Sequence, residues 1–257
     1  MPDTPRGHFI WYECLTKDKE AAVDYYTKLI GWGTTDWESD MGPYTMWTKD
    51  ETPIGGVMVL PEEAMAGVPP FWLGYISTPD TDATTDQTTE LGGAILVPPM
   101  TIPTIGRMAV LKDPQGAIFA CYTPETPALP PGPPEPGSFS WHELITTDWG
   151  AGLEFYSALF GWEKKDAMDM GEMGTYQMYG LPGSDAPLGG MYNMPPETPV
   201  PNWLLYAMVE SVDAAAERMN SGLGGTVLRG PMEVPGGSRV VQCQDPQGAA
   251  FAMHSEG

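Results

Sequence analysis

The stretch FIWYECLTKDKEAAVDYYTKLIGW, residues 9–32, decides the fold, because a second copy, FSWHELITTDWGAGLEFYSALFGW, occupies residues 139–162. The two copies align without a gap at an offset of 130 residues, and 10 of the 24 aligned positions are identical. Self-similarity over a fixed offset indicates repeated folding units. This offset is too long for a solenoid repeat, so the sequence predicts two homologous domains.

Each copy predicts a strand, a tight turn and a helix. Residues 9–15 are rich in strand formers. Asp18 and Asp148 are placed to cap the helices by accepting a hydrogen bond from a free backbone N–H. Gly31 and Gly161 end the helices, because glycine readily adopts positive φ. Each helix carries one apolar stripe, which needs a sheet to cover.

Each half continues with short strands, a second strand–helix unit and an Asp-Pro-Gln-Gly sequence that suits a type I turn. Glycine pairs at 55–56 and 189–190 lie inside predicted strands, where they suggest a bulge or a close backbone approach. Each half thus holds two β-α-β-β-β modules. We predict an α+β fold of four modules, in which each half forms a curved sheet cup with its helices outside.

The predicted domain limits follow from a proline-rich stretch in the middle of the chain. Residues 123–138 contain seven prolines and predict an extended, semi-stiff linker. The linker separates a first domain at 1–122 from a second at 139–257. A chain of 257 residues is long enough for two domains of about 120 residues each.

The composition excludes several classes of partner. The net charge is -22, from 34 acidic and 12 basic residues, and this field repels nucleic acid and anionic lipid. We find no apolar run long enough to span a membrane and no signal peptide. Cys14, Cys121 and Cys243 lack metal-site spacing and are interpreted as free thiols. We therefore expect a cytoplasmic protein. The composition leaves open whether it is a monomer or a homodimer.

The ordered set of motifs, present twice, resembles the vicinal oxygen chelate superfamily of glyoxalases, bleomycin resistance proteins and extradiol dioxygenases. The set comprises WxE(L/C)xTxD, a helix ending in Gly-Trp, a paired glycine and the Asp-Pro-Gln-Gly turn. The resemblance covers nearly the whole chain outside the linker. It is greatest to the two-domain, glyoxalase-like members, and it implies a ligand site on the concave face of each sheet.

The resemblance also implies a divalent metal ion held by His and Glu on that face. The corresponding positions hold Trp, Leu and Ala in both halves, and none of these can ligate a metal. The positions are Trp11, Leu73 and Ala120 in the first half and Trp141, Leu204 and Ala252 in the second. We therefore expect a protein without a metal or another cofactor.

Glu13 and Glu143 are the candidate catalytic residues. Each lies two residues after a tryptophan and shares its face of the strand. A carboxylate in an aromatic-lined cup can act as a general base. The alternative is a structural ion pair with Arg107 and Arg239, which could instead bind a substrate carboxylate.

Aromatic side chains and one histidine are expected to face the two cups by strand phase. They would stack on a flat or hydrophobic ligand, although core filling is an equally open interpretation. His142 lies out of phase with the cup and is expected to pack, whereas His254 is in phase and could contact a ligand or donate a proton. The candidate ligand-binding residues are Trp11, Tyr75, Arg107 and Tyr122 in the first half and Trp141, Tyr206, Arg239 and His254 in the second.

The leading functional hypothesis is a glyoxalase-like protein that binds a small hydrophobic or aromatic molecule in a metal-free cup. The second is an enzyme, either a lyase or isomerase of the glyoxalase I type or a metal-free proton-transfer enzyme using Glu13 or Glu143. An extradiol dioxygenase is less favoured because it needs the missing ligands. A protein-interaction role with degenerate cups is a fourth possibility.

Overall fold

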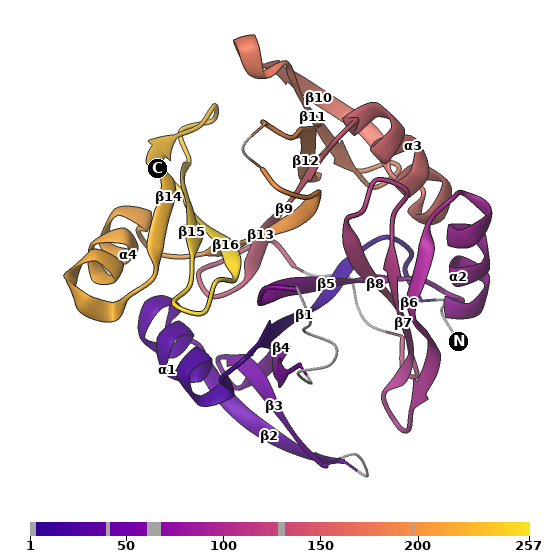
Figure 1. The fold of residues 1–257 in the computed structure, drawn as a ribbon, viewed down its shortest axis with the longest axis horizontal. Helices are drawn as coiled ribbons and strands as arrows, with labels where there is room; N and C mark the ends of the chain where they lie inside the picture. Colours follow the sequence, from indigo (N-terminus) through magenta and orange to yellow (C-terminus); the bar gives the residue numbers. More distant parts are fainter. Residues whose placement is uncertain (1–3, 40–41, 61–67, 128–131, 197) are drawn as a thin grey trace. The chain divides into compact units, whose positions relative to one another are not determined.

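The computed structural model describes residues 4–39, 42–60, 68–127, 132–196 and 198–257. Each half of the chain forms one eight-stranded sheet (Figure 1). The strand orders are β2-β3-β4-β1-β5-β8-β7-β6 and β10-β11-β12-β9-β13-β16-β15-β14. The element order repeats the β-α-β-β-β pattern four times, which confirms the predicted α+β fold of four modules.

The elements of the first half are β1 Phe9–Thr16, α1 Lys19–Ile30, β2 Gly33–Ser39, β3 Gly42–Lys49, β4 Thr52–Val59, β5 Phe71–Ser77, α2 Thr81–Glu90, β6 Ala94–Ile102, β7 Gly106–Lys112 and β8 Ile118–Pro124. Those of the second half are β9 Phe139–Thr146, α3 Trp149–Phe160, β10 Glu163–Asp169, η1 Gly171–Met173, β11 Thr175–Gly180, β12 Pro187–Asn193, β13 Asn202–Met208, α4 Val212–Arg218, η2 Met219–Leu223, β14 Thr226–Glu233, β15 Arg239–Gln244 and β16 Ala250–Ser255.

The ends of α1 and α3 follow the predicted capping residues. The Asp18 side chain accepts a hydrogen bond from the Ala21 backbone N–H, and the Asp148 side chain caps α3 in the same way. Gly31 and Gly161 end the helices with φ values of 95° and 76°. Only the left-handed region gives these φ values, and glycine enters it without a steric cost.

The chain clusters into two compact units, and each unit combines segments of both halves. Unit 1 comprises Met1–Ile10, Gly74–Gly132 and Trp141–Trp203, and unit 2 comprises Trp11–Leu73, Pro133–Ser140 and Leu204–Gly257. Within unit 1, α2 lies beside α3; within unit 2, α1 lies beside α4 and η2 (Figure 1). Helices that are distant in sequence are therefore neighbours within each unit.

Aromatic side chains fill the core of each unit and include a buried hydrogen-bonded chain. In unit 2, Trp72 Nε1 donates to the Tyr26 hydroxyl at 2.8 Å, and that hydroxyl donates to Asp245 at 3.1 Å. In unit 1, Trp203, Tyr156 and Asp113 form the same chain, with both distances 3.1 Å. These bonds satisfy polar atoms that would otherwise be costly to bury.

The two Asp-Pro-Gln-Gly turns join the modules within each unit. One oxygen of Asp245 accepts three backbone N–H groups of its own turn, which fixes the turn geometry. Two residues further on, the Gln247 side chain accepts from the Asp18 backbone N–H at 2.8 Å and donates to the Asp18 carbonyl at 2.8 Å. Gln115 makes the equivalent contacts with Asp148 in unit 1. Each turn therefore binds the start of the first helix of the opposite half.

The paired glycines permit close backbone and side-chain approach, as their position in the sequence predicts. A Cβ on Gly55 would overlap the Tyr12 carbonyl, and one on Gly189 would overlap the His142 carbonyl. A Cβ on Gly56 would overlap the Tyr44 hydroxyl, and one on Gly190 would overlap the Tyr176 ring.

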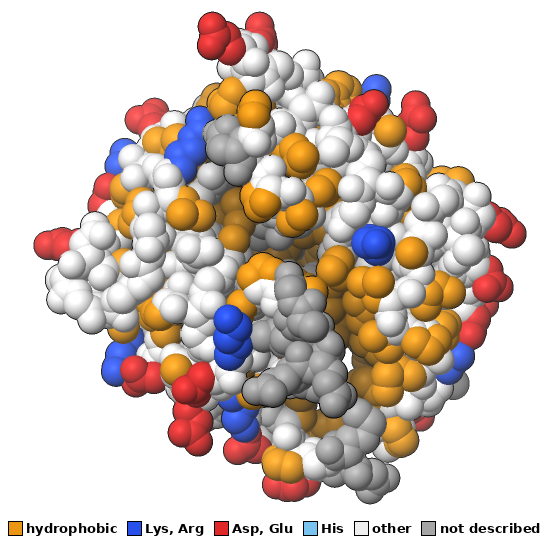
Figure 2. Space-filling view, in the orientation of Figure 1, with side chains coloured by type: hydrophobic (Ala, Val, Ile, Leu, Met, Phe, Trp, Pro, Cys, Tyr) orange, Lys and Arg blue, Asp and Glu red, His pale blue; other side chains and the backbone are white. Residues whose placement is uncertain are grey.

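Hydrophobic side chains are exposed on edge strand β6. Ile95, Leu96 and Val97 are 45%, 45% and 36% exposed, and hydrophobic side chains gather over β6 and β7 in Figure 2. Among the residues described, no helix is both long and apolar enough to cross a membrane.

Candidate ligand-binding site

A hydrogen-bonded Trp–Tyr–Glu triad lies on β1 and β3 in unit 2. Trp11 Nε1 donates to the Tyr44 hydroxyl at 3.1 Å, and the hydroxyl donates to Glu13 Oε1 at 2.7 Å. Trp11 and Glu13 lie two residues apart on one strand, so they share one face of the sheet. On β4, Gly56 is in register with Glu13 of β1, and its lack of a side chain leaves room for the Tyr44 hydroxyl.

The same triad occurs on β9 and β11 in unit 1. Trp141 Nε1 donates to the Tyr176 hydroxyl at 2.7 Å, and the hydroxyl donates to Glu143 Oε2 at 2.9 Å. Gly190 is paired with Glu143 and takes the place that Gly56 has in unit 2. Trp141 and Glu143 therefore share one face of the strand, as strand alternation predicts, and Tyr176 connects them.

The direction of the hydrogen bonds within each triad is fixed by chemistry. An indole N–H can only donate, so the tyrosine oxygen accepts from Trp and directs its own proton to the carboxylate. Burial, together with the neighbouring Glu13 carboxylate, raises the pKa of Tyr44 above its ordinary value. Tyr44 therefore stays protonated and neutral. Glu13 and Glu143 are each only 5% exposed, whereas both triad indoles are half-buried.

A second polar group lies on the face of β13, β16 and β15 in unit 2. Tyr206 and Gln242 are both in register with Ala252, which lies on the strand between them. Gln242 Nε2 donates to the Tyr206 hydroxyl at 3.1 Å, so this bond passes over the small alanine side chain. His254 lies on the same face, half-buried, with Nδ1 3.0 Å from Ser140 Oγ, and burial lowers its pKa.

The equivalent face of unit 1 has the same register without the glutamine. Tyr75 and Val110 are both in register with Ala120. Val110 cannot hydrogen-bond to the tyrosine. Further along β8, the Tyr122 hydroxyl donates to the Ile105 carbonyl at 2.8 Å, and burial raises the pKa of Tyr122 to about 12.

The predicted pairing of the arginines with the triad glutamates is corrected by the structure. Arg107 donates to both carboxylate oxygens of Asp82 at 2.5 and 2.7 Å, and Arg239 donates to both oxygens of Asp213 at 2.8 Å. Both aspartates lie in the first turn of a helix, α2 or α4, next to the strand that carries the arginine. Both ion pairs are half exposed at the surface, and such pairs contribute little to stability.

Comparison with known proteins identifies the family. The model described as the Glyoxalase/Bleomycin resistance protein/Dioxygenase superfamily matches residues 8–120 and 138–253. The chain belongs to this superfamily.

Two groups of superfamily relatives show similarity over almost the whole chain. A Mycobacterium tuberculosis protein named "Putative glyoxylase CFP32" is 32% identical over 246 residues, which is 95% of this chain and 92% of the relative. The anthracycline biosynthesis protein DnrV of Streptomyces peucetius is 31% identical over 256 residues, with 95% and 91% covered.

Solved structures share the superfamily fold at low sequence identity. The Mn(II)-bound glyoxalase from Novosphingobium aromaticivorans gives a TM-score of 0.65 at 16% identity, covering 99% of this chain and 83% of that one. A mutant of 4-hydroxymandelate synthase from Streptomyces coelicolor gives 0.67 at 11% identity, covering 98% and 93%. At such identities the likeness establishes the fold alone.

The side chains of this superfamily member do not fit the metal that the resemblance implies. Leu73, Leu204, Ala120 and Ala252 are buried aliphatic residues at the ligand positions, and Trp and Ala or Leu side chains supply no metal-binding atom. Within the described ranges, no group of three or more His, Cys, Asp or Glu side chains could hold a metal ion.

His142 packs in the core, as its strand phase predicts. It is buried, its ring stacks on Phe9 with centroids 3.8 Å apart, and its Nδ1 lies 2.9 Å from the Leu188 carbonyl. Desolvation lowers its pKa to about 4. A neutral, stacked imidazole of this kind is a packing residue.

Three residues of these sites were missed in the sequence: Tyr44, Tyr176 and Gln242. The two tyrosines carry a signal, since they occupy matching positions in the two halves, in YTMW and YQMY. Gln242 carries none, because its counterpart is Val110. Only the strand register brings it to Tyr206.

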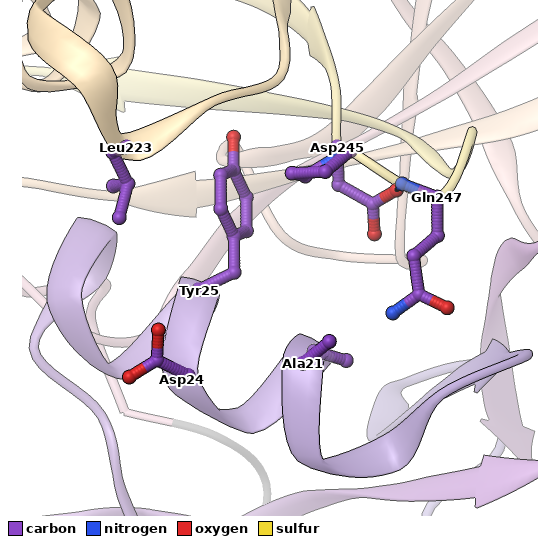
Figure 3. A pocket seen from close by; sticks show the side chains of 8 residues that line it. Ala21, Asp24, Tyr25, Leu223, Asp245 and Gln247 are labelled. Atoms are coloured by element: carbon purple, nitrogen blue, oxygen red, sulfur yellow. Dashed lines mark hydrogen bonds between the residues drawn. The ribbon is translucent and has the colours of Figure 1, made fainter.

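A small cavity of about 210 Å³ lies in unit 2 between α1 and the second Asp-Pro-Gln-Gly turn (Figure 3). Tyr25 rises from α1 between Leu223 and Asp245, and Gln247 lies beside Ala21 (Figure 3). The buried Tyr25 hydroxyl has no hydrogen-bond partner among the described residues. Its counterpart in the other half is phenylalanine, so the repeat does not require this hydroxyl.

Proposed function

We propose that this glyoxalase-like protein binds a small hydrophobic or aromatic molecule, without a metal, on the sheet face that carries the Trp–Tyr–Glu triad in each half. The observation that carries the proposal is the triad itself. A tryptophan stands where the family resemblance places a metal-binding histidine, and both halves hold it in the same way.

The triad prepares the indole ring for stacking. The polar N–H of each tryptophan is already bound to a tyrosine hydroxyl, while the ring remains half-exposed. What the ring presents is therefore a fixed apolar surface. Aromatic pairs in such arrangements contribute about 0.5–1.5 kcal/mol beyond the buried area. The adjacent carboxylate can accept a hydrogen bond from a donor group on the ligand.

The names of the relatives bear on both candidate functions. One relative is named for anthracycline biosynthesis, and anthracyclines are flat, fused-ring aromatic molecules. Another is named as a glyoxylase, which corresponds to the enzymatic alternative. The proposal extends the first of these chemistries, a flat aromatic ring, to this chain.

Binding of fluorene and 9-fluorenone, measured by equilibrium dialysis at micromolar concentration, tests the proposal. We expect the wild-type protein to bind at least one of them, and Trp11→Leu with Trp141→Leu to weaken binding by about 10-fold or more, since each loses its stacking surface. Trp149→Leu is the matched control. Trp149 is a half-buried residue at the start of α3, the Lys164 ammonium lies over its ring, and it belongs to neither triad. Absence of binding, or equal loss in the control, contradicts the proposal.

A metal-free proton-transfer enzyme is the second candidate, favoured by the tyrosine–carboxylate hydrogen bond. The bond orients Glu13 and Glu143 as acceptors beside a stacking surface. Such a base would exchange an acidic C–H proton of a bound ketone, which proton NMR in deuterium oxide follows directly. The double variant Glu13→Gln, Glu143→Gln should abolish exchange; exchange at the wild-type rate would exclude this candidate.

A further inference from the structure

The small cavity between α1 and the second Asp-Pro-Gln-Gly turn combines apolar walls with an unpartnered hydroxyl group. Its volume is about 210 Å³, and the Tyr25 side chain is one of its walls (Figure 3). Tyr25 is only 3% exposed, and its hydroxyl makes no hydrogen bond among the described residues. An unpaired buried hydroxyl is costly, so its presence in a native fold calls for an explanation.

Comparison of the two halves shows that the fold does not need this hydroxyl. Tyr25 corresponds to Phe155 in the repeat, and Phe155 is likewise a buried aromatic residue. Gly225 leaves room for the hydroxyl, because a Cβ at this position would lie 2.6 Å from the Tyr25 oxygen. The hydroxyl is therefore an addition in unit 2 and not a part of the shared framework.

The chain that passes the cavity is also one residue longer than its counterpart in the first half. Asp82 lies 10 residues before the paired glycines that follow α2, whereas Asp213 lies 11 residues before those that follow η2. The longer chain forms the π-helical turn η2, in which Gly222 leaves the helical region with a φ of 118°. Such turns are rare and frequently lie at functional sites. Leu223, the last residue of η2, lines the cavity.

The charges around the cavity favour a neutral ligand that carries an acceptor atom. Burial raises the pKa of Tyr25, so the phenol keeps its proton and can donate it. The Asp245 carboxylate accepts hydrogen bonds from its own turn and from the Tyr26 hydroxyl. Asp24, at the exposed edge, pairs with Lys28 at 2.6 Å. The two carboxylates disfavour an anion, and their existing partners leave neither of them to hold a cation.

We propose that this cavity is a second binding site, in unit 2, for a neutral molecule of about one aromatic ring that carries a carbonyl oxygen. A cavity of about 150 Å³ is enough to bind benzene, so the volume here suffices for a substituted ring. The carbonyl oxygen accepts the proton of the Tyr25 hydroxyl. Ala21 and Asp24 are exposed, so the site is open to solvent along α1. It uses no triad residue and is independent of the proposed function.

The test compares acetophenone with ethylbenzene, which share a phenyl ring and differ in a carbonyl against a methylene group. Ligand-observed NMR titration gives the dissociation constant of each probe. We expect the wild-type protein to bind acetophenone about 3- to 10-fold more tightly, as one neutral hydrogen bond permits. Tyr25→Phe, which copies Phe155, should bring this ratio towards one. It should leave the affinity for ethylbenzene within about twofold, because the ring is retained.

Ala21→Leu places a larger side chain at the cavity and should weaken the binding of both probes by about 5-fold or more, since overpacking is costly. Ala151→Leu is the matched control, because Ala151 is the equally exposed counterpart on α3, and it should leave both affinities unchanged. The double variant Trp11→Leu, Trp141→Leu should also retain them, which distinguishes this site from the triad faces.

Two results would overturn the inference while the proposed function stands. One is a wild-type protein that does not bind acetophenone at millimolar concentration or does not prefer it to ethylbenzene. The other is a preference that survives in Tyr25→Phe, or binding that survives unchanged in Ala21→Leu. Circular dichroism of each variant confirms that lost binding does not reflect lost folding.

Discussion

His142 shows how one residue of the repeat has changed its chemistry while keeping its place. Its counterpart in the first half is Tyr12, which stacks on Phe139 with centroids 3.8 Å apart. His142 stacks on Phe9 at the same distance. The aromatic contact is preserved, but only the histidine can take up a proton near neutral pH.

Acidification should therefore destabilise the protein through His142. Its pKa is about 4 in the folded state against an ordinary value of 6.5, so the unfolded chain binds more protons between these values. The contribution is fully present above about pH 6.5 and is lost as pH falls to about 4, amounting to roughly 3 kcal/mol. His142→Tyr, which copies Tyr12, should remove this part of the pH dependence.

Urea unfolding at pH values from 4 to 7.5 measures the effect. The free energy of unfolding of the wild type should fall more steeply with acid than that of His142→Tyr. Parallel curves for the two proteins would show that the imidazole keeps an ordinary pKa in the folded state.

Residue-level prediction from the sequence was successful where strand alternation decides the outcome. Trp11 and Glu13 share a face, and His142 is packed, as their positions in the strand require. The ion-pair partners of the arginines were not predictable in this way. Arg107 binds Asp82, although matching positions in the two halves pointed to the glutamates, because equal positions in a repeat carry no information about distance.

At the scale of elements, the Asp-Pro-Gln-Gly turns do more than reverse the chain. The local sequence predicts the turn and also predicts the caps of α1 and α3. It does not predict that the glutamine of one turn binds the N-terminus of a helix more than 200 residues away, because that contact depends on tertiary packing.

Removing the Gln247 side chain should destabilise both its own turn and the N-terminus of α1. Gln247→Ala should lower the free energy of unfolding by about 1–2 kcal/mol, since the Asp18 backbone N–H and carbonyl both lose a partner. Gln115→Ala should act alike at Asp148. Hydrogen exchange adds a local measurement, in which the Asp18 amide loses protection in Gln247→Ala only.

Gln87→Ala is the control for this pair, because its half-buried side chain donates to the Ala158 carbonyl at 3.2 Å and lies away from both turns. We expect a change within about 0.5 kcal/mol. A loss as large as that of Gln247→Ala would mean that the turn contact has no special importance.

At the scale of the whole molecule, the compact units do not follow the halves of the sequence. Each unit takes one module from either side of the linker. The repeat predicts two eight-stranded sheets correctly but gives no indication of this exchange, since all four modules share one pattern. The domain limits of 1–122 and 139–257 remain predictions from the repeat and the proline-rich linker.

Separately produced halves, residues 1–127 and 132–257, should therefore complement each other. Alone, each half lacks one module of both units and exposes aromatic core, such as Trp32, which otherwise packs against Phe139. We expect each to self-associate or unfold readily, and an equimolar mixture to form a 1:1 complex with cooperative unfolding. Gel filtration and thermal unfolding measure this; two halves that are monomeric and stable alone would contradict it.

The reciprocal ring contacts, Phe9 with His142 and Tyr12 with Phe139, bear on how such a gene changes after doubling. The two copies cannot change independently, because a substitution in the first strand of one copy alters a ring contact with the first strand of the other. Selection on these four positions acts on pairs that lie about 130 codons apart. Descendants of this gene should therefore inherit matched combinations at 9 with 142 and at 12 with 139, even where their ligands have diverged.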